Sequence, residues 1–343
     1  MSRDRIDAID QELQRLISER ATLVHADGVH LTEQDARALA AVLAENTGPL
    51  DDASMLRIFR EILDAGHALS APYSVAYLGP EGTYSHAATQ RHFGQAVDGR
   101  PQPGIAEIFR AVEGGQARFG VAPVENSTEG TVNQTLDLLM GTSLRICGEV
   151  RVRIEHRLLS RERALGDISS VHAHPQALAQ CRHWLEACLP GVKQVSESSN
   201  AEAARLAALP EAAGVAAIAG EAAAVLYALE TLESGIEDIK TNTTRFIVVG
   251  DHDAAPSGRD TTSLLIGAPH RPGGLLHMLE PFEVAGVSMT RIESRPSRDS
   301  LWDYVFFIDV EGHQTDSTLA PVIAELRHLA PRLRVLGSYP AAL

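Results

Sequence analysis

The stretch "SVAYLGPEGTYSHAA" at residues 74–88 sets the fold class of the central part of the chain. A short apolar run leads into a glycine-bearing loop, after which Thr83 or Ser85 stands where a helix would begin. A strand that passes through a tight loop into a helix is the repeating unit of α/β folds. On its own the loop requires no more than a capped turn, although both hydroxyl groups are also placed to contact a ligand.

Strand-length apolar runs separated by helical stretches continue from this unit to residue 250. They are "FGVAPV", "LRICGEVRV", "SSVHAH", "VAAIAG" and "RFIVVG". Residues 73–250 are therefore predicted to form an α/β domain. Ligands of such folds bind at the carboxyl ends of the strands, against helix N-termini whose free N–H groups favour anions.

The two flanking segments follow other patterns. Residues 1–70 show helical periodicity throughout, and three helices bury so little surface that they need a docking partner or a second copy. Residues 261–343 follow the βαββαβ order of the ferredoxin-like arrangement, beyond a polar boundary at residues 251–260. The prediction is a helical domain at 1–70, an α/β domain at 73–250 and a ferredoxin-like domain at 261–343.

Composition restricts the class of partner and the compartment. The 343 residues carry 30 Lys and Arg against 45 Asp and Glu, a net charge of −15, and no basic stripe. This balance argues against nucleic acid and membrane surfaces as partners, but not against a small anionic ligand in a locally positive pocket. The three cysteines lack metal-site and disulfide spacing, so no metal is expected. The N-terminus has no apolar signal segment, which predicts a cytoplasmic location.

Three further loops carry polar side chains where a strand is expected to end or begin. The loop "PVENSTEGTV" (123–132) holds more hydrogen-bonding groups than a turn requires, although a surface turn explains it about equally well. The loop "HAHPQAL" (172–178) places His174 before a helix start, as a capping residue or a proton carrier. In "TNTTRF" (241–246) the threonines either satisfy the backbone groups of a turn or take part in a reaction. Arg245 either faces a ligand or forms a structural ion pair. Together these loops predict a cleft for a small anionic molecule.

The motifs "GPEGTYSHAA", "PVENSTEGTV", "HPQALAQC", "AAIA" and "NTTRF", in this order and spacing, resemble those of prephenate dehydratase. The segment "PGGLLHMLEPFEVAGVSMTRIESRP" (272–296) resembles the ACT regulatory domain, and residues 3–70 resemble the helical chorismate mutase domain of bifunctional enzymes. The resemblance implies a two-lobed α/β cleft similar to type II periplasmic binding proteins. The chain would leave the first lobe near residue 153 and return near residue 241.

The reaction implied by the resemblance converts prephenate into phenylpyruvate, carbon dioxide and water, without a cofactor. The enzyme has to donate a proton to the leaving hydroxyl and hold two carboxylates, and the family motif assigns the donor role to Thr244. The other catalytic residues implied are His174, Asn126 and Ser127. The substrate-binding residues implied are Thr83, Ser85, Glu125, Thr131 and Arg245.

The ACT resemblance implies phenylalanine as an effector, bound at a dimer interface of a homodimer or homotetramer. The implied effector site consists of Gly273, Gly274, Leu275 and Leu276 together with Glu293, Ser294, Arg295 and Pro296. Gly274 stands where the family has an alanine, so the strength of effector binding stays open. A glycine pair is also what the turn at this position needs for its backbone.

The mutase-like segment departs from its family. Arg3 and Arg20 match the two arginines of the first helix, but the lysine expected further along is missing, with His30 as the nearby cation. Arg37 lacks its usual glutamate neighbour, and Ser70 stands where a glutamine is expected. Loss of several charge-assisted contacts predicts weak or absent mutase activity on chorismate, with the helices kept as a dimerisation or docking element.

Three alternatives stay open beside this prediction. The chain would be fully bifunctional if a partner helix supplied the missing mutase groups. A prephenate decarboxylase of the same fold is the nearest enzymatic rival, and the threonine of "NTTRF" argues against it because that reaction expels no hydroxyl. A solute-binding or amino-acid-sensing protein shares the cleft or the ACT domain, but the first needs a signal peptide and the second needs no polar cleft.

Overall fold

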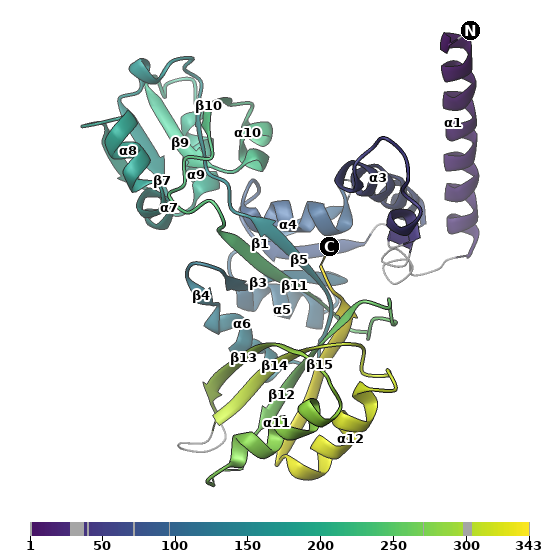
Figure 1. Cartoon of the computed structure of the whole chain (residues 1–343). Helices are drawn as coiled ribbons and strands as arrows, with labels where there is room; N and C mark the ends of the chain where they lie inside the picture. The colour runs from purple at the N-terminus through teal and green to yellow at the C-terminus, as the bar shows by residue number, and fades with distance from the viewer. Residues whose placement is uncertain are drawn as a thin grey trace.

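The structure is a computed structural model, and it describes residues 2–27, 38–39, 41–70, 73–95, 97–269, 271–297 and 304–342. Its α/β region forms two lobes, a third sheet lies at the C-terminal end, and helices lie at the N-terminal end (Figure 1). His30 and Arg37 of the mutase-like segment lie outside the described residues.

The first lobe is built on a six-stranded sheet with the order β2-β1-β3-β11-β5, to which β4 is attached through β3. Its strands are β1 (Ser74–Leu78), β2 (Asp98–Gln102), β3 (Phe119–Asn126), β4 (Gly130–Thr131), β5 (Arg145–Arg153) and β11 (Thr243–Gly250). Helix α4 (Tyr84–Phe93) packs on one face of this sheet, and α5 (Ile105–Glu113) and α6 (Asn133–Leu139) pack on the other. Strand β11 runs antiparallel to both β3 and β5.

The second lobe is inserted between β5 and β11, so the chain crosses between the lobes twice, as expected. Its sheet has the order β10-β6-β9-β7-β8. Its strands are β6 (Arg157–Ser160), β7 (Ser170–Ala173), β8 (Lys193–Ser196), β9 (Val215–Ala219) and β10 (Glu230–Ser234). Its helices are the 3₁₀ turn Leu165–Asp167, α7 (Pro175–Gln180), α8 (Arg182–Cys188), α9 (Asn200–Ala207) and α10 (Glu221–Tyr227). Two apolar clusters belong to this lobe.

The C-terminal sheet has the order β13-β14-β12-β15, which confirms the ferredoxin-like arrangement. Its elements are β12 (Asp260–Gly267), α11 (Gly274–Val284), β13 (Met289–Pro296), β14 (Tyr304–Glu311), α12 (Leu319–Leu329) and β15 (Arg332–Pro340). The two helices pack together against one face of the sheet, over a core of buried aliphatic and aromatic residues.

The other face of this sheet is joined to the first lobe by a continuous apolar core. Phe307 and Leu336 from the C-terminal sheet belong to the same buried cluster as Ile146 and Ile247 from the first lobe. Gly337 makes the close approach possible, because a Cβ atom there would lie 2.0 Å from the carbonyl oxygen of Ile146. Figure 1 shows β15 running up from the C-terminal sheet alongside β5.

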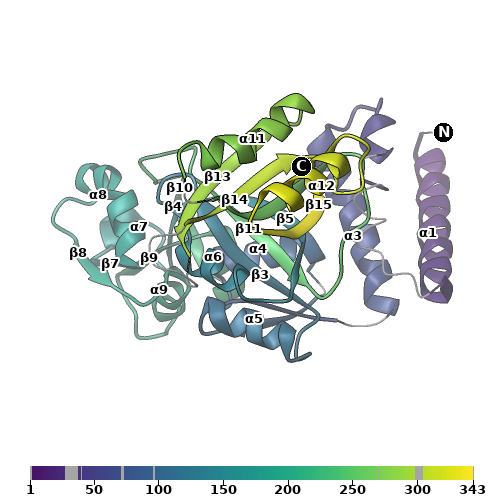
Figure 2. The same ribbon diagram turned by 90° about the horizontal axis from the view of Figure 1, so that it is seen from below.

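The N-terminal helices leave a large apolar surface uncovered. Helix α1 (Ser2–Asp27) stands at the edge of the molecule beside α3 (Asp52–Ser70), as Figures 1 and 2 both show. Ile6, Leu13 and Leu23 on α1 are 54%, 51% and 61% exposed. The helical periodicity predicted from the sequence thus yields an apolar face on α1, which the described part of the chain leaves exposed. Among the described residues, the helices are too short or too polar for one of them to cross a membrane.

Candidate active site between the two lobes

The polar loops meet at a cavity of about 400 Å³ between the two lobes. Its wall contains Thr83, Ser85, Asn126, His174 and Thr244, five of the residues singled out from the sequence. The N-termini of α4 and α9 also lie in this wall, where free N–H groups favour an anion. Larger cavities of about 720 and 920 Å³ lie between domains, but they contain fewer of these residues.

Asn126 and Thr244 form the central pair of the first-lobe wall. The Nδ2 atom of Asn126 donates to the Thr244 hydroxyl oxygen at 2.8 Å and to Oδ1 of Asn242 at 2.9 Å. Its Oδ1 accepts from the backbone N–H groups of Thr128 at 2.9 Å and Glu129 at 3.0 Å. These backbone donors fix which end of the amide is oxygen. Thr244 is thus an acceptor toward Asn126, and no acceptor for its own hydrogen is found among the described residues, so the hydrogen can be donated to a ligand.

The pairing of strands β3 and β11 brings Asn126 and Thr244 together. Strands β3 and β11 are antiparallel, with Asn126 opposite Thr244 and Glu125 opposite Arg245. Successive side chains of a strand point to opposite faces of the sheet. Thr244 therefore faces the cleft while Arg245, the next residue, faces the C-terminal sheet.

The glycine-bearing loop is shaped by capping interactions. Gly82 has a φ of +82°, a conformation that favours glycine, and its N–H donates to Nδ1 of His86 at 3.1 Å. The Thr83 oxygen accepts from the N–H of His86 at 3.3 Å, and its hydroxyl lies 2.9 Å from the Pro80 carbonyl oxygen. Thr83 is therefore the N-cap of α4, as predicted, and Ser85 is buried one residue inside the helix.

His174 belongs to the second-lobe wall. Its ring accepts at Nδ1 from the N–H of Gln176 at 3.3 Å, so it caps α7. Its own N–H donates to Oδ1 of Asn200 at 2.9 Å. Because Nδ1 is an acceptor, the neutral ring carries its proton on Nε2. The cap predicted from the sequence is thus present, and Nε2 remains for a ligand.

Among the cavity residues that were not singled out from the sequence, three polar ones lie close to the expected residues. His156 is buried, with Nδ1 3.1 Å from the Tyr84 hydroxyl and Nε2 2.8 Å from Oε1 of Gln180. Burial lowers the pKa of His156 and raises that of Tyr84, so both are neutral at pH 7. The third residue, after His156 and Tyr84, is Asn242, which accepts a hydrogen bond from Asn126. Its position inside "TNTTRF" was its only signal in the sequence.

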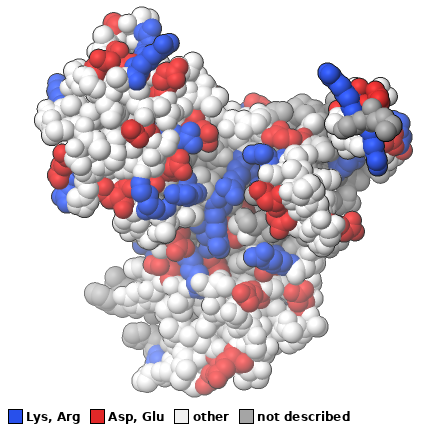
Figure 3. Space-filling view, turned by 45° about the horizontal axis from the view of Figure 1, so that its top comes forward, with Lys and Arg blue, Asp and Glu red and all other residues white. Residues whose placement is uncertain are grey.

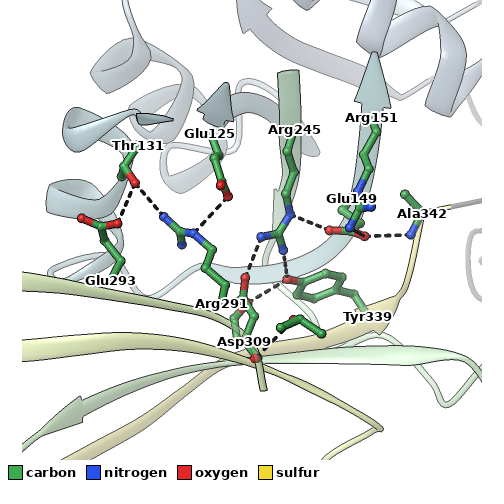
Figure 4. Close-up of polar contacts among 12 residues, drawn as sticks. Glu125, Thr131, Glu149, Arg151, Arg245, Arg291, Glu293, Asp309, Tyr339 and Ala342 are labelled. Atoms are coloured by element: carbon green, nitrogen blue, oxygen red, sulfur yellow. Dashed lines mark hydrogen bonds and ion pairs between the residues drawn. The ribbon is translucent and has the colours of Figure 1, made fainter. Parts of the chain in front are cut away.

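Four of the expected residues lie outside this cavity. Ser127 accepts from the N–H of Thr243 at 2.9 Å and so holds the start of β11. Glu125, Thr131 and Arg245 face the C-terminal sheet instead, where their side chains contact those of Arg291, Glu293 and Asp309 (Figure 4). The structure thus separates the sequence motifs into a cleft group and an interdomain group.

The expected effector residues belong to two elements of the C-terminal sheet. Gly273 and Gly274 begin α11 with Leu275 and Leu276, and Leu276 is 59% exposed. Ser294 and Pro296 lie in β13 with Glu293 and Arg295. Glu293 accepts from Thr131 at 2.9 Å, and Arg295 pairs with Asp137 at 2.6 Å, so both reach the first lobe.

The close packing around position 274 explains why this residue is a glycine. A Cβ atom there would lie 2.1 Å from the carbonyl oxygen of Pro269, which no side chain tolerates without a backbone shift. This chain therefore cannot accept the alanine of the family motif in its present turn.

The mutase-like arginines lie far apart. Arg3 and Arg20 lie near opposite ends of α1. A rise of 1.5 Å per residue separates their Cα atoms by about 25 Å. One chain therefore cannot bring both side chains to one small substrate.

Comparison with known proteins agrees with this geometry. Family models described as "Prephenate dehydratase" and "ACT domain" match residues 75–254 and 262–328. A bifunctional chorismate mutase/prephenate dehydratase of Neisseria gonorrhoeae is 45% identical over 99% of this chain and 96% of its own. A prephenate dehydratase structure from Arthrobacter aurescens in complex with L-Phe is 36% identical, with a TM-score of 0.71 over 78% of this chain and 90% of that one. A structure described as a novel type of quorum-quenching acylase is 33% identical, with a TM-score of 0.72 over 78% and 97%.

Proposed function

The chain belongs to the prephenate dehydratase family, and from that premise we propose that the cleft between its lobes acts on prephenate with Thr244 as the proton donor. The observation that carries this assignment is the 2.8 Å hydrogen bond in which Thr244 accepts from Asn126. Since the Asn126 amide occupies the threonine oxygen, the threonine hydrogen is free to be donated to the substrate.

The reaction needs little beyond this donor. As the ring C–O bond breaks, a proton goes to the departing hydroxyl, which leaves as water. The bond to the ring carboxylate breaks as well, its electron pair enters the ring, and carbon dioxide leaves. A threonine is a weak acid, so it acts by a hydrogen bond that strengthens as negative charge develops on the leaving oxygen. Donation from Asn126 into Thr244 polarises that hydroxyl and favours this role.

The remaining cavity groups are suited to the two carboxylates. Thr83 and Ser85 stand at the N-terminus of α4, and Asn200 stands at that of α9. A helix N-terminus stabilises a carboxylate by charge and by its free N–H groups. His174 lies on the opposite lobe and offers Nε2 for placing the substrate. Ser127, whose side chain holds the backbone of Thr243, acts on the reaction through β11.

Phenylalanine is the effector we propose for the ACT domain. The support is the match of residues 262–328 to that domain and the L-Phe complex of the related dehydratase structure. The segments at Gly273–Leu276 and Glu293–Pro296 are the proposed contacts. A cytoplasmic location accords with this biosynthetic role.

A second copy of the chain is proposed to cover α1. The exposed apolar stripe on that helix needs a partner, and a partner helix running in the opposite direction would place its Arg20 near Arg3 of the first chain. We therefore propose a homodimer or homotetramer. The bifunctional relative spans this segment, but the residues missing here make weak or absent chorismate mutase activity the expectation.

One assay series tests these assignments. Prephenate and chorismate are supplied separately, and phenylpyruvate is followed with and without phenylalanine. Phenylpyruvate from prephenate, inhibited by phenylalanine, is the expected result. Absence of product from prephenate contradicts the dehydratase function, and brisk conversion of chorismate contradicts the expectation of a weak mutase.

A further inference from the structure

Side chains of the C-terminal sheet reach the two strands that carry the catalytic pair (Figure 4). We propose that Arg245 and Glu125 are positioning residues, through which Asp309 and Arg291 of the ACT domain hold Thr244 and Asn126 at their working distance. The ACT domain would then be a structural part of the dehydratase site as well as a sensor. This inference rests on the proposed function.

Arg245 is the stronger of the two connections. Its Nε donates to Glu149 at 2.6 Å, one terminal nitrogen to Asp309 at 2.6 Å, and the other to the Tyr339 hydroxyl at 2.9 Å. The side chains of Arg245, Glu149 and Asp309 are 13%, 1% and 5% exposed. Charge pairs so poorly hydrated are rigid, and removal of one member leaves a buried charge without its partner. Of the partners, Asp309 and Tyr339 belong to the C-terminal sheet.

Glu125 makes the second connection. Arg291 of β13 pairs with Glu125 at 3.1 Å and donates to the Thr131 hydroxyl at 3.2 Å. Thr131 in turn donates to Glu293, two residues along the same strand, at 2.9 Å. Strand β13 therefore contacts both β3 and the short strand β4 that follows it.

The two connections lie one residue away from the catalytic pair on each strand. Asn126 and Thr244 form one rung of the β3–β11 ladder, and Glu125 and Arg245 form the next. Adjacent residues of a paired strand cannot move independently by much, because the backbone hydrogen bonds link them. A hydrogen bond of 2.8 Å is largely lost beyond about 3.5 Å, so a displacement of less than 1 Å at the second rung reaches the first.

The same strand gives effector binding a route to the cleft. Glu293 and Arg295, two of the residues proposed to contact phenylalanine, bind Thr131 and Asp137 of the first lobe. An amino acid that recruited these side chains would compete with those contacts. Strand β13 would then lose its contacts with β4 and the ion pair between Arg291 and Glu125.

The test compares three full-length variants with the native chain. Asp309→Asn keeps shape but removes the charge that faces Arg245, and Glu125→Gln does the same at the partly exposed second connection. Arg334→Gln is the matched control, because Arg334 also crosses the interface. Its hydrogen bonds within the described part of the chain go to the carbonyl oxygens of Met140 and Thr142, outside β3 and β11. Turnover of prephenate, its KM and the thermal midpoint are measured for each.

We expect kcat to fall at least tenfold in Asp309→Asn and threefold in Glu125→Gln, with KM changed less than twofold. Arg334→Gln should lose thermal stability at unchanged kcat. Restoring the charge with Asp309→Glu should recover part of kcat, which a role in folding alone would not require. If Glu125→Gln and a folded Asp309→Asn both keep native kcat, the inference is wrong. An inactive native chain contradicts the proposed function instead.

A different observation carries a second inference, at the cavity of about 920 Å³ between α3, α4 and α10. Its wall contains five arginines, Arg57, Arg60, Arg91, Arg153 and Arg157, against three glutamates, in a chain whose net charge is −15. Figure 3 shows Lys and Arg side chains gathered in a band across the hollow between the second lobe and the N-terminal helices. Gly82, Thr83, Tyr84 and Gly220 line both this cavity and the cleft, so the two adjoin.

We infer that this basic cavity is a vestibule that collects the dianionic substrate before it enters the cleft. Although Arg157 pairs with Glu155 and Glu221, the wall keeps an excess of arginines over glutamates. A concave surface with an excess of positive charge raises the local concentration of an anionic ligand and its rate of association. This inference likewise rests on the proposed function.

Arg57→Gln with Arg91→Gln, in one full-length variant, tests the vestibule. At low salt we expect kcat/KM for prephenate to fall about fivefold with kcat unchanged, and the difference to vanish near 0.5 M salt, where charges are screened within a few ångströms. Arg327→Gln on the exposed side of α12 is the control and should match the native chain. Equal kcat/KM and equal salt dependence in variant and native chain would overturn the inference.

Discussion

The side-chain amide of Asn126 donates to the hydroxyl oxygen of Thr244 across 2.8 Å, with the orientation of the amide fixed by two backbone N–H groups. Replacing Asn126 with aspartate keeps the shape and removes both amide donors. Thr244 then faces a carboxylate and donates its hydrogen to it rather than to the substrate. We expect Asn126→Asp to lower kcat by about a hundredfold, the typical cost of one transition-state donor. Steady-state turnover of prephenate measures this, and a kcat within threefold of native would contradict it.

Thr244 itself is tested by a pair of substitutions. Thr244→Ala removes the proton donor and should lower kcat by at least about a hundredfold while the fold is kept. Thr244→Ser retains a hydroxyl on the same strand and should keep most of that activity. Circular dichroism shows whether both variants are folded. Near-native turnover in Thr244→Ala would remove threonine from the mechanism.

Gly274 offers a prediction on stability. In Gly274→Ala the new methyl group meets the carbonyl oxygen of Pro269 at 2.1 Å, so the turn before α11 has to shift. We expect a loss of about 1–3 kcal/mol, as is usual for overpacking, and a weaker thermal shift with phenylalanine. Gly166→Ala, where a Cβ atom meets nothing within 4 Å, is the control and should leave the thermal midpoint unchanged. An equal midpoint for both variants would show that the turn adapts freely.

Acid should destabilise the chain through histidines whose rings are partly or fully withdrawn from water, His92 among them. Burial, aided by the charge of Arg60, lowers the pKa of His92 from 6.5 to about 4. Between pH 6.5 and 4, His92 is protonated in the unfolded chain but stays neutral in the folded chain. The free energy of unfolding that is present above pH 6.5 is therefore lost as the pH falls toward 4. The slope is at most about 1.4 kcal/mol per pH unit for each such group.

Unfolding by urea at several pH values measures this slope. His92→Gln should flatten it between pH 6.5 and 4, while His328→Gln at an exposed position of α12 should not. An unchanged slope in His92→Gln would assign the acid lability to other groups, such as His156, whose pKa burial also lowers.

The sequence predicted the buried parts of the fold better than its edges. The apolar runs that become β1, β3, β9 and β11 were recognised because central strands are buried on both faces. Strands β2, β8 and β10, with the sequences "DGRPQ", "KQVS" and "ETLES", were missed because they lie at sheet edges, are largely exposed and carry no apolar pattern. The central strand β6, "RLLS", was missed as well, although it is buried, because its apolar run is only two residues long.

The site, too, was predicted only where a local sequence pattern carried a signal. Polar loops at strand ends identified the cleft through Asn126, His174 and Thr244, because strand order alone brings them together. The separation of Thr244 from Arg245 was available from the alternation of a strand, which sends neighbours to opposite faces. His156 carried no signal, since its partners Tyr84 and Gln180 come from distant parts of the chain.

The apolar cluster that joins Ile146 and Ile247 to Phe307 and Leu336 bears on how such a chain can be recombined. A crossover between residues 254 and 260 would divide one core into two incomplete halves, so chimeras cut there should aggregate. Exchange at the two lobe crossings, residues 154–156 and 237–242, would transfer the second lobe with both of its own clusters intact. The part of this enzyme that can be exchanged between relatives is therefore the inserted second lobe. The ACT domain has to be kept together with the first lobe, which carries Thr244.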